Sequence, residues 1–170
     1  MAYIKPLLLL CILFNYCAEP SLVVYGIKDN PLSLDPSFGL DFDESQISAQ
    51  IYENLVILDN DCKTLNPCLA QSWNISEDKC TYTFVLRDSI FFHDGTKLSS
   101  MSVLSTFDWL RVKPNRSEIY DKVKRLDVID SLTFKIILHK PYSIFLYVLA
   151  SPESFQIMSE RAISLYDSLI

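Results

Sequence analysis

The sequence is poor in positive charge and lacks several patterns that would indicate catalysis. Its 15 lysine and arginine residues are outnumbered by 21 aspartate and glutamate residues, which gives a net charge of −6. No basic stripe is present to neutralise phosphates, so nucleic-acid binding is not expected. The sequence also has no nucleophile elbow of the kind that hydrolases carry and no internal repeat. These absences predict a protein that is not an enzyme.

Patterns that hold a metal or a proton-transfer pair are missing as well. Asp41, Asp43 and Glu44 lack the spacing of an EF-hand loop, and a helix start favours acidic residues in any case. His93 and Asp94 are adjacent, but the sequence places no third catalytic partner beside them. A structural role for His93 next to a turn is therefore the favoured interpretation, and no cofactor is expected.

The cysteines outside the N-terminal segment are odd in number. They are Cys62, Cys68 and Cys80, and three thiols cannot all pair within the chain. Cys62 and Cys68 flank a short turn-like segment and could bridge in an oxidising compartment, and the sequence leaves the pairing of the three open. Without a C-x-x-C spacing, the three cysteines and His93 do not indicate a zinc site. No metal site is predicted.

The N-terminal segment has a short apolar run. Lys5 precedes it, and the run covers eight residues from Leu7 to Phe14. A membrane-spanning helix needs ~20 apolar residues, whereas this length fits the core of a secretory signal. We expect residues 1–17 to be a signal peptide or lipoprotein signal and the protein to reach the periplasm or cell-envelope exterior. Cys17 is the lipidation candidate for membrane anchoring, although residues 14–16 lack the small side chains of a lipobox.

Apolar periodicity predicts a mixed α/β (α+β) chain. Tyr82, Phe84 and Leu86 alternate with less apolar neighbours, which is typical of a half-buried strand, and Ser99 is the expected N-cap of a helix. The expected order begins with a buried strand at 22–27, a proline-containing loop at 29–36 and a helix from Asp43, whose apolar stripe runs through Ile47, Ile51, Leu55 and Leu58. Strands at 80–87 and 89–92 and a helix at 100–110 are expected next. A hairpin at 123–130 and 132–139 and helices at 143–149 and 160–169 complete the order. This mixture argues against an all-β sandwich.

The stretch from Thr64 to Gly95 carries an ordered set of motifs. They are Pro67, Leu69-Ala70, Ser72-Trp73, Tyr82-Thr83-Phe84, Leu86-Arg87 and Phe92-His93-Asp94-Gly95, with Leu34-Asp35-Pro36 and residues 51–56 before them and residues 132–146 after them. This set resembles the signature of the family 5 solute-binding proteins, the extracytoplasmic peptide- and nickel-capturing subunits of ABC importers. The resemblance covers roughly residue 21 to the C-terminus.

The resemblance implies a fold and a binding role. Residues 18–170 would be the N-terminal part of a family 5 domain, within lobe one of a periplasmic-binding-protein type II fold, and the second lobe would be absent from this sequence. The implied ligand is an oligopeptide, bound weakly without the second lobe. The implied partners are the permease subunits of an ABC transporter in the full-length family.

The resemblance also suggests ligand-binding residues. The extended segment Asn30, Pro31, Leu32, Ser33 and Leu34 would line the cleft, where its backbone could pair with a peptide. Ser105 stands where the family usually has an aromatic residue near the cleft. This and other departures, including Asn54 in place of a common glycine, leave an alternative open: a degenerate or truncated paralogue that acts as a non-transport interaction protein of the envelope.

Overall fold

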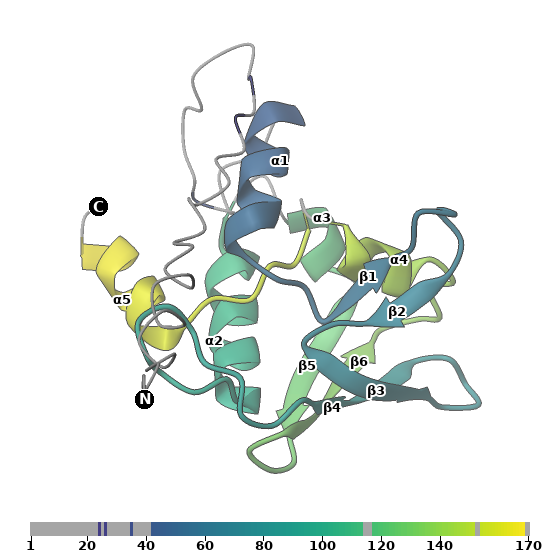
Figure 1. The fold of residues 1–170 in the computed structure, drawn as a ribbon. Helices are drawn as coiled ribbons and strands as arrows, with labels where there is room; N and C mark the ends of the chain where they lie inside the picture. The colour runs from purple at the N-terminus through teal and green to yellow at the C-terminus, as the bar shows by residue number, and fades with distance from the viewer. Residues whose placement is uncertain are drawn as a thin grey trace, which may run out of the picture.

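A computed structural model of the chain describes residues 24, 26, 35, 42–113, 117–151 and 154–168. Its elements follow the order α1 (Phe42–Ile51), β1 (Val56–Leu58), β2 (Leu65–Pro67), β3 (Ala70–Ile75), β4 (Thr81–Leu86), α2 (Ser100–Arg111), α3 (Ser117–Tyr120), β5 (Val123–Val128), β6 (Thr133–Leu138), α4 (Phe145–Ala150) and α5 (Glu160–Ser168). Figure 1 shows α2 between the strands and α5. Within these described ranges, no helix has both the length and the apolar character needed to cross a membrane.

A four-stranded antiparallel sheet forms the centre of the described fold. Its strand order is β3-β4-β6-β5. Phe84 of β4 lies opposite Phe134 of β6, and the two buried rings stack with their centroids 5.3 Å apart. The alternation predicted for β4 is confirmed, because Tyr82, Phe84 and Leu86 are buried and Val85 is exposed.

Helix α2 closes the core beside this sheet. The Ser99 hydroxyl accepts a hydrogen bond from the backbone N–H of Ser102, so the predicted N-cap is confirmed. Val103, Phe107 and Leu110 are buried in the same apolar cluster as the strands, as their spacing predicts. The hairpin of β5 and β6 and the helices α4 and α5 also lie where the sequence places them, with ends that differ by a few residues.

A small second sheet, β1 with β2, packs on α4. The Tyr147 hydroxyl of α4 donates a hydrogen bond to the backbone oxygen of Lys63 in the β1–β2 loop, at 3.0 Å. The buried Asn54 side chain donates to the backbone oxygens of Leu149 and Ser151, each at 2.8 Å. Because the last carbonyls of a helix have no partner within it, Asn54 satisfies the end of α4.

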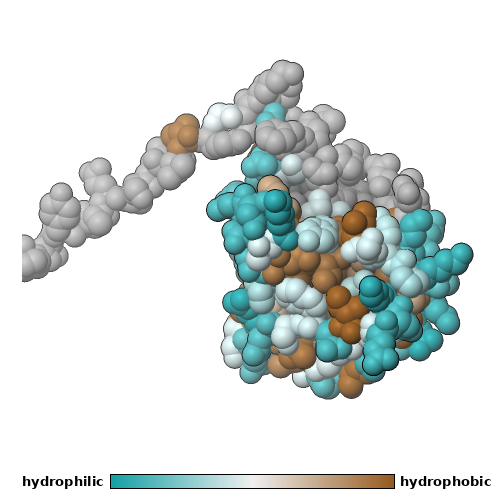
Figure 2. All heavy atoms as spheres, turned by 90° about the vertical axis from the view of Figure 1, so that its right-hand side faces the viewer, coloured by the Kyte–Doolittle hydropathy of each residue, from teal (hydrophilic) through white to brown (hydrophobic). Residues whose placement is uncertain are grey.

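The face that carries this second sheet is mixed in character. Figure 2 shows apolar side chains near its middle with hydrophilic side chains around them. Ile57 and Leu58 of β1, Ile144 at the start of α4 and Tyr147 are among the exposed large hydrophobic residues. Exposed apolar side chains of this kind are common on folded proteins.

The helix predicted to extend to Leu58 is wrong beyond Ile51. The Leu55 backbone oxygen accepts hydrogen bonds from the N–H groups of Cys68 at 3.2 Å and Ala70 at 2.9 Å. Residues 56–58 then form β1 opposite β2. Bonds to a segment downstream replace the helical bonds. Leu55 and Val56 are buried, whereas Ile57 and Leu58 of β1 are exposed.

Three other expectations about strands differ from the structure. Val24 is 82% exposed and lies in neither helix nor strand, so the predicted buried strand is not found there; most of residues 22–27 fall outside the described part. Residues 89–92 form no strand, and only an isolated bridge joins Phe91 to Lys97. The sequence predicts no strand at 65–67 or 70–75, where the structure has β2 and β3.

The bridge that Cys62 and Cys68 could form is not present among the described residues. Cys62, Cys68 and Cys80 are all free thiols. Cys62 lies before β2 and Cys68 lies just after it.

Candidate functional site

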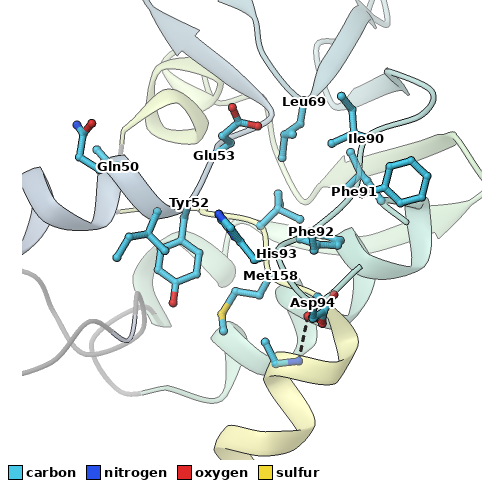
Figure 3. A pocket seen from close by; sticks show the side chains of 16 residues that line it. Gln50, Tyr52, Glu53, Leu69, Ile90, Phe91, Phe92, His93, Asp94 and Met158 are labelled. Carbon is cyan, nitrogen blue, oxygen red and sulfur yellow. Dashed lines mark hydrogen bonds between the residues drawn. The ribbon is translucent and has the colours of Figure 1, made fainter. Parts of the chain in front are cut away.

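A cavity of about 650 Å³ lies where the end of α1, the segment after β4 and the start of α5 meet. Figure 3 shows side chains from these elements around it. The lining residues are Ala49, Gln50, Ile51, Tyr52, Glu53, Leu69, Ile90, Phe91, Phe92, His93, Asp94, Leu98, Ile157, Met158, Ser159 and Ala162. A volume of this size is within the usual range for small-molecule sites.

Long-range hydrogen bonds fix the inner wall of the cavity. The backbone N–H of Ile157 donates to the backbone oxygen of Glu53 at 2.9 Å. The buried Thr106 hydroxyl of α2 accepts from the N–H of Met158 at 3.0 Å and donates to its carbonyl oxygen at 3.2 Å. These bonds hold residues 157 and 158 in an extended path across α2. The position of this wall is therefore fixed by hydrogen bonds to the backbone of residues 157 and 158.

A tight turn forms another wall. The backbone N–H of Phe92 donates to the oxygen of Thr96, and the N–H of Gly95 donates to the oxygen of Phe92, both at 2.9 Å. Gly95 has a φ of 81°, which glycine adopts without the steric cost that a β-carbon brings. The Asp94 carboxylate accepts from the Thr96 N–H at 2.9 Å and from its hydroxyl at 2.6 Å. The Asp-Gly turn predicted from the sequence is confirmed.

Asp94 also connects this turn to α5. The Ser159 hydroxyl donates to Asp94 Oδ2 at 2.6 Å and accepts from the backbone N–H of Ala162 at 3.0 Å, which is the bonding of an N-cap. Hydrogen bonds from Ser159 and then from Thr96 lower the pKa of Asp94 to about 2, with a smaller contribution from the charge of Arg161. Asp94 is thus a charged structural anchor for the start of α5.

We expect Asp94→Asn to destabilise the chain at pH 6 by an amount that shrinks as the pH falls toward 3. A carboxyl whose pKa falls from 3.8 to about 2 on folding adds stability that is present above the unfolded pKa. That stability is lost as the pH falls through the folded pKa. Urea denaturation of the wild type and the variant at pH 6, 5, 4 and 3 measures the difference.

A double-mutant cycle provides the control for this prediction. Ser159→Ala removes the donor to Asp94, so the effects of the two substitutions should be non-additive at pH 6. Additive effects, or a difference between wild type and Asp94→Asn that stays constant with pH, would contradict the role assigned to this hydrogen bond.

The lining of the cavity is acidic at its edge and apolar inside. It contains Glu53 and Asp94 but no lysine or arginine among the described lining residues. Burial, followed by a hydrogen bond with Tyr166, raises the pKa of Tyr52, so its hydroxyl stays neutral. Two acidic side chains without a lysine or arginine beside them disfavour a bound anion in this cavity and tolerate a cation or a neutral group.

Of the ligand residues suggested by the family resemblance, the structure describes only Ser105. Residues 30–34 and Cys17 are outside the described residues. Ser105 lies in α2, partly buried, and is not among the residues that line the cavity. Its role in binding stays a prediction. His93, by contrast, does line the cavity and is exposed.

Sequence reasoning missed most of this site. The apolar stripe predicts a helix at Tyr52 and Glu53, and residues 157–159 carry no periodic or motif signal. Only the Phe92–Gly95 motif marked any part of the cavity. Across the described residues, no group of three or more His, Cys, Asp or Glu side chains could hold a metal ion.

Comparison with known proteins identifies the family. The family model described as bacterial extracellular solute-binding proteins, family 5 Middle, matches residues 64–163. This chain belongs to that family. The glutathione-binding protein GsiB of Salmonella paratyphi A is 32% identical over 147 residues, which are 85% of this chain and 28% of that protein. GsiB of Escherichia coli K12 is 33% identical over 138 residues, 79% of this chain and 27% of its own length.

Solved structures agree with the family assignment. The periplasmic binding protein DppA of Helicobacter pylori, solved with the peptide STSA, superposes with a TM-score of 0.71 at 25% identity and covers 81% of this chain and 30% of its own. NikA of Brucella suis, solved with Fe(III)-EDTA, gives 0.68 at 27% identity and covers 78% and 27%. The fold is that of periplasmic binding proteins, and the chain spans less than a third of these relatives.

Proposed function

We propose that the chain is the N-terminal part of an exported, peptide-binding subunit of an ABC importer and has no catalytic role. The observation that carries this proposal is the family match over residues 64–163. The likeness to a binding protein solved with the peptide STSA favours a peptide as ligand. Export through residues 1–17, lipid attachment at Cys17 and docking on permease subunits belong to the same proposal.

The described cavity supports a binding role. It combines an apolar interior with a few polar groups at the edge, which is the usual make-up of a ligand site. Its walls are fixed by hydrogen bonds between distant segments, such as Ile157 to Glu53 and Ser159 to Asp94. A site that is already formed before the ligand arrives loses less entropy on binding.

We expect the 170-residue chain to bind short peptides saturably but no more tightly than ~100 μM. The chain spans only 28% of the length of its GsiB relatives, so it offers only part of the contacts that a whole binding protein can make. NMR titration of the isotope-labelled chain with mixed di-, tri- and tetrapeptides measures the affinity.

Two outcomes of this titration would count against the proposal. No saturable shift at 10 mM peptide, a ligand concentration about a hundred times the expected limit, would remove peptide binding as the function. Submicromolar affinity would show that this part of the chain supplies a full set of contacts by itself. A matched mixture of the free amino acids, which lack peptide bonds, serves as the control ligand.

A further inference from the structure

Strand β5 lies at one edge of the central sheet. The strand order is β3-β4-β6-β5, so β6 is its one neighbour among the described strands. The Ile129 N–H donates to the Thr133 oxygen at 2.9 Å. Because bonded pairs of an antiparallel ladder recur at every second residue, the backbone groups of Arg125 and Asp127 also face β6, and those of Leu126 face away. Among the described residues, no backbone group outside the sheet bonds to Leu126.

The side chains of β5 carry an ordered pair of opposite charges. Arg125 Nε donates to both oxygens of the Asp127 carboxylate, each at 2.9 Å. Leu126 lies between them and packs on the core from the other face of the strand. Lys135 of β6 lies opposite Asp127. The edge therefore presents a positive and a negative side chain two residues apart on its solvent face.

A second copy of the chain fits this edge in antiparallel orientation. A two-fold axis at Leu126 places Leu126 of both copies opposite one another, where their outward N–H and C=O groups can form two hydrogen bonds. The same axis places Arg125 of each copy opposite Asp127 of the other. Opposite charges directly across a strand pair stabilise it. With the bonds along each strand, the four charges alternate in sign around a closed ring.

The charges also select this register over its neighbours. An axis at Arg125 would place two arginines opposite each other, and an axis at Asp127 would do the same for two aspartates. Like charges in directly opposite positions are destabilising. Charges on an edge strand commonly discourage any pairing, whereas this pair discourages the neighbouring registers and favours one.

We infer that β5 is a self-association edge, at which two copies of the chain pair antiparallel about Leu126 and join their four-stranded sheets into one continuous sheet. The Arg125 and Asp127 contacts lie on the solvent face, so the association is weak and is reduced by salt. No residue of β5 lines the cavity, so this inference is independent of the proposed binding function.

Charge-swapped variants test the register. Sedimentation velocity of the 170-residue chain at pH 7 and low salt, with a thiol reductant, measures the dissociation constant of the dimer. Arg125→Asp places aspartates opposite each other across the pair, and Asp127→Arg places arginines there. Each variant alone should dimerise about tenfold more weakly. An equal mixture of the two variants restores opposite charges at both positions and should associate as tightly as the wild type.

Matched substitutions control for net charge. Lys140→Asp changes the net charge as Arg125→Asp does, and Glu77→Arg changes it as Asp127→Arg does. Both control positions are exposed and lie outside β5. Neither control should change the dissociation constant by more than about twofold, because exposed charges away from the interface are largely screened. Circular dichroism checks that each variant keeps its fold.

Amide hydrogen exchange of the wild type provides a second measurement without any substitution. The outward N–H of Leu126 should exchange about tenfold more slowly when nine-tenths of the chain is dimeric, because only the remaining monomer leaves it open. The N–H of Asp127 already faces β6, so its exchange should not depend on protein concentration.

Several results would overturn the inference. A wild-type chain that stays monomeric at ~1 mM, or a dimer that both charge variants leave unchanged, removes β5 as the interface. A mixture that associates no more tightly than the folded single variants removes the proposed register. Should a variant lose its fold, exchange at Leu126 decides, and a rate that is independent of concentration overturns the inference.

Discussion

Replacing Phe84 by alanine is expected to lower the free energy of unfolding by about 3–5 kcal/mol, the usual cost for a buried phenylalanine. Phe84 is fully buried in the central strand β4. Its ring stacks on Phe134 with an interplanar angle of 13°, so alanine removes both the burial and the ring pair. Urea denaturation followed by circular dichroism measures the change.

Phe91→Ala is the matched control for this prediction. Phe91 is 62% exposed, and removing an exposed ring usually changes stability by no more than about 0.5 kcal/mol. If Phe84→Ala cost as little as Phe91→Ala, the stacked pair across β4 and β6 would not be the centre of the core.

Replacing Asn54 by alanine is expected to cost about 2–4 kcal/mol, because one buried and one partly buried acceptor lose their donor and each costs about 1–2 kcal/mol. The Asn54 amide donates to Leu149 and Ser151 at the end of α4. Alanine cannot reach either oxygen, and burial limits the access of water. Thermal and urea unfolding measure the loss.

Asn74→Ala provides the comparison at an exposed position of β3. It should change stability by at most about 0.5 kcal/mol. A glycine at position 54, which also lacks the amide, should be at least as costly as alanine here. Stability within 0.5 kcal/mol of the wild type, the range of an ordinary surface change, would show that α4 does not depend on this side chain.

The parts of the fold that were predictable carry their signal within a few residues. The alternation of Tyr82, Phe84 and Leu86 depends only on strand geometry, and Ser99 binds a backbone group three residues away. The Asp94-Gly95 turn is equally local. In each case the partners that decide the structure lie next to the motif in the chain.

The parts that were missed depend on distant partners. Residues 54–58 have the spacing of a helix stripe, yet Leu55 bonds to Cys68 and Ala70. The buried side of α1 holds Glu44 and Ser48, whereas Ile51 is exposed. Ser48 bonds to Gln156, 108 residues away, and no local pattern predicts such a pair.

In the cavity, too, the part with a local sequence signal was predictable and the parts made by distant residues were not. The motif Phe92–Gly95 marked one wall, because a turn signal is local. Glu53 and Met158 come together only through bonds to Ile157 and Thr106. Sequence reasoning therefore identified the family and one wall, and the remaining walls required the tertiary structure.

The strand order β3-β4-β6-β5 also has a consequence for how the chain folds. The outer pairs, β3 with β4 and β5 with β6, are hairpins between neighbours in sequence. The central pair joins Val85 to Thr133 and Thr81 to Ile137, so roughly fifty residues must be closed into a loop before it forms. Hairpins form in ~1–10 μs, while non-local pairing is slower. The docking of two preformed hairpins is therefore the expected rate-limiting step, with the rings of Phe84 and Phe134 meeting as the barrier is crossed.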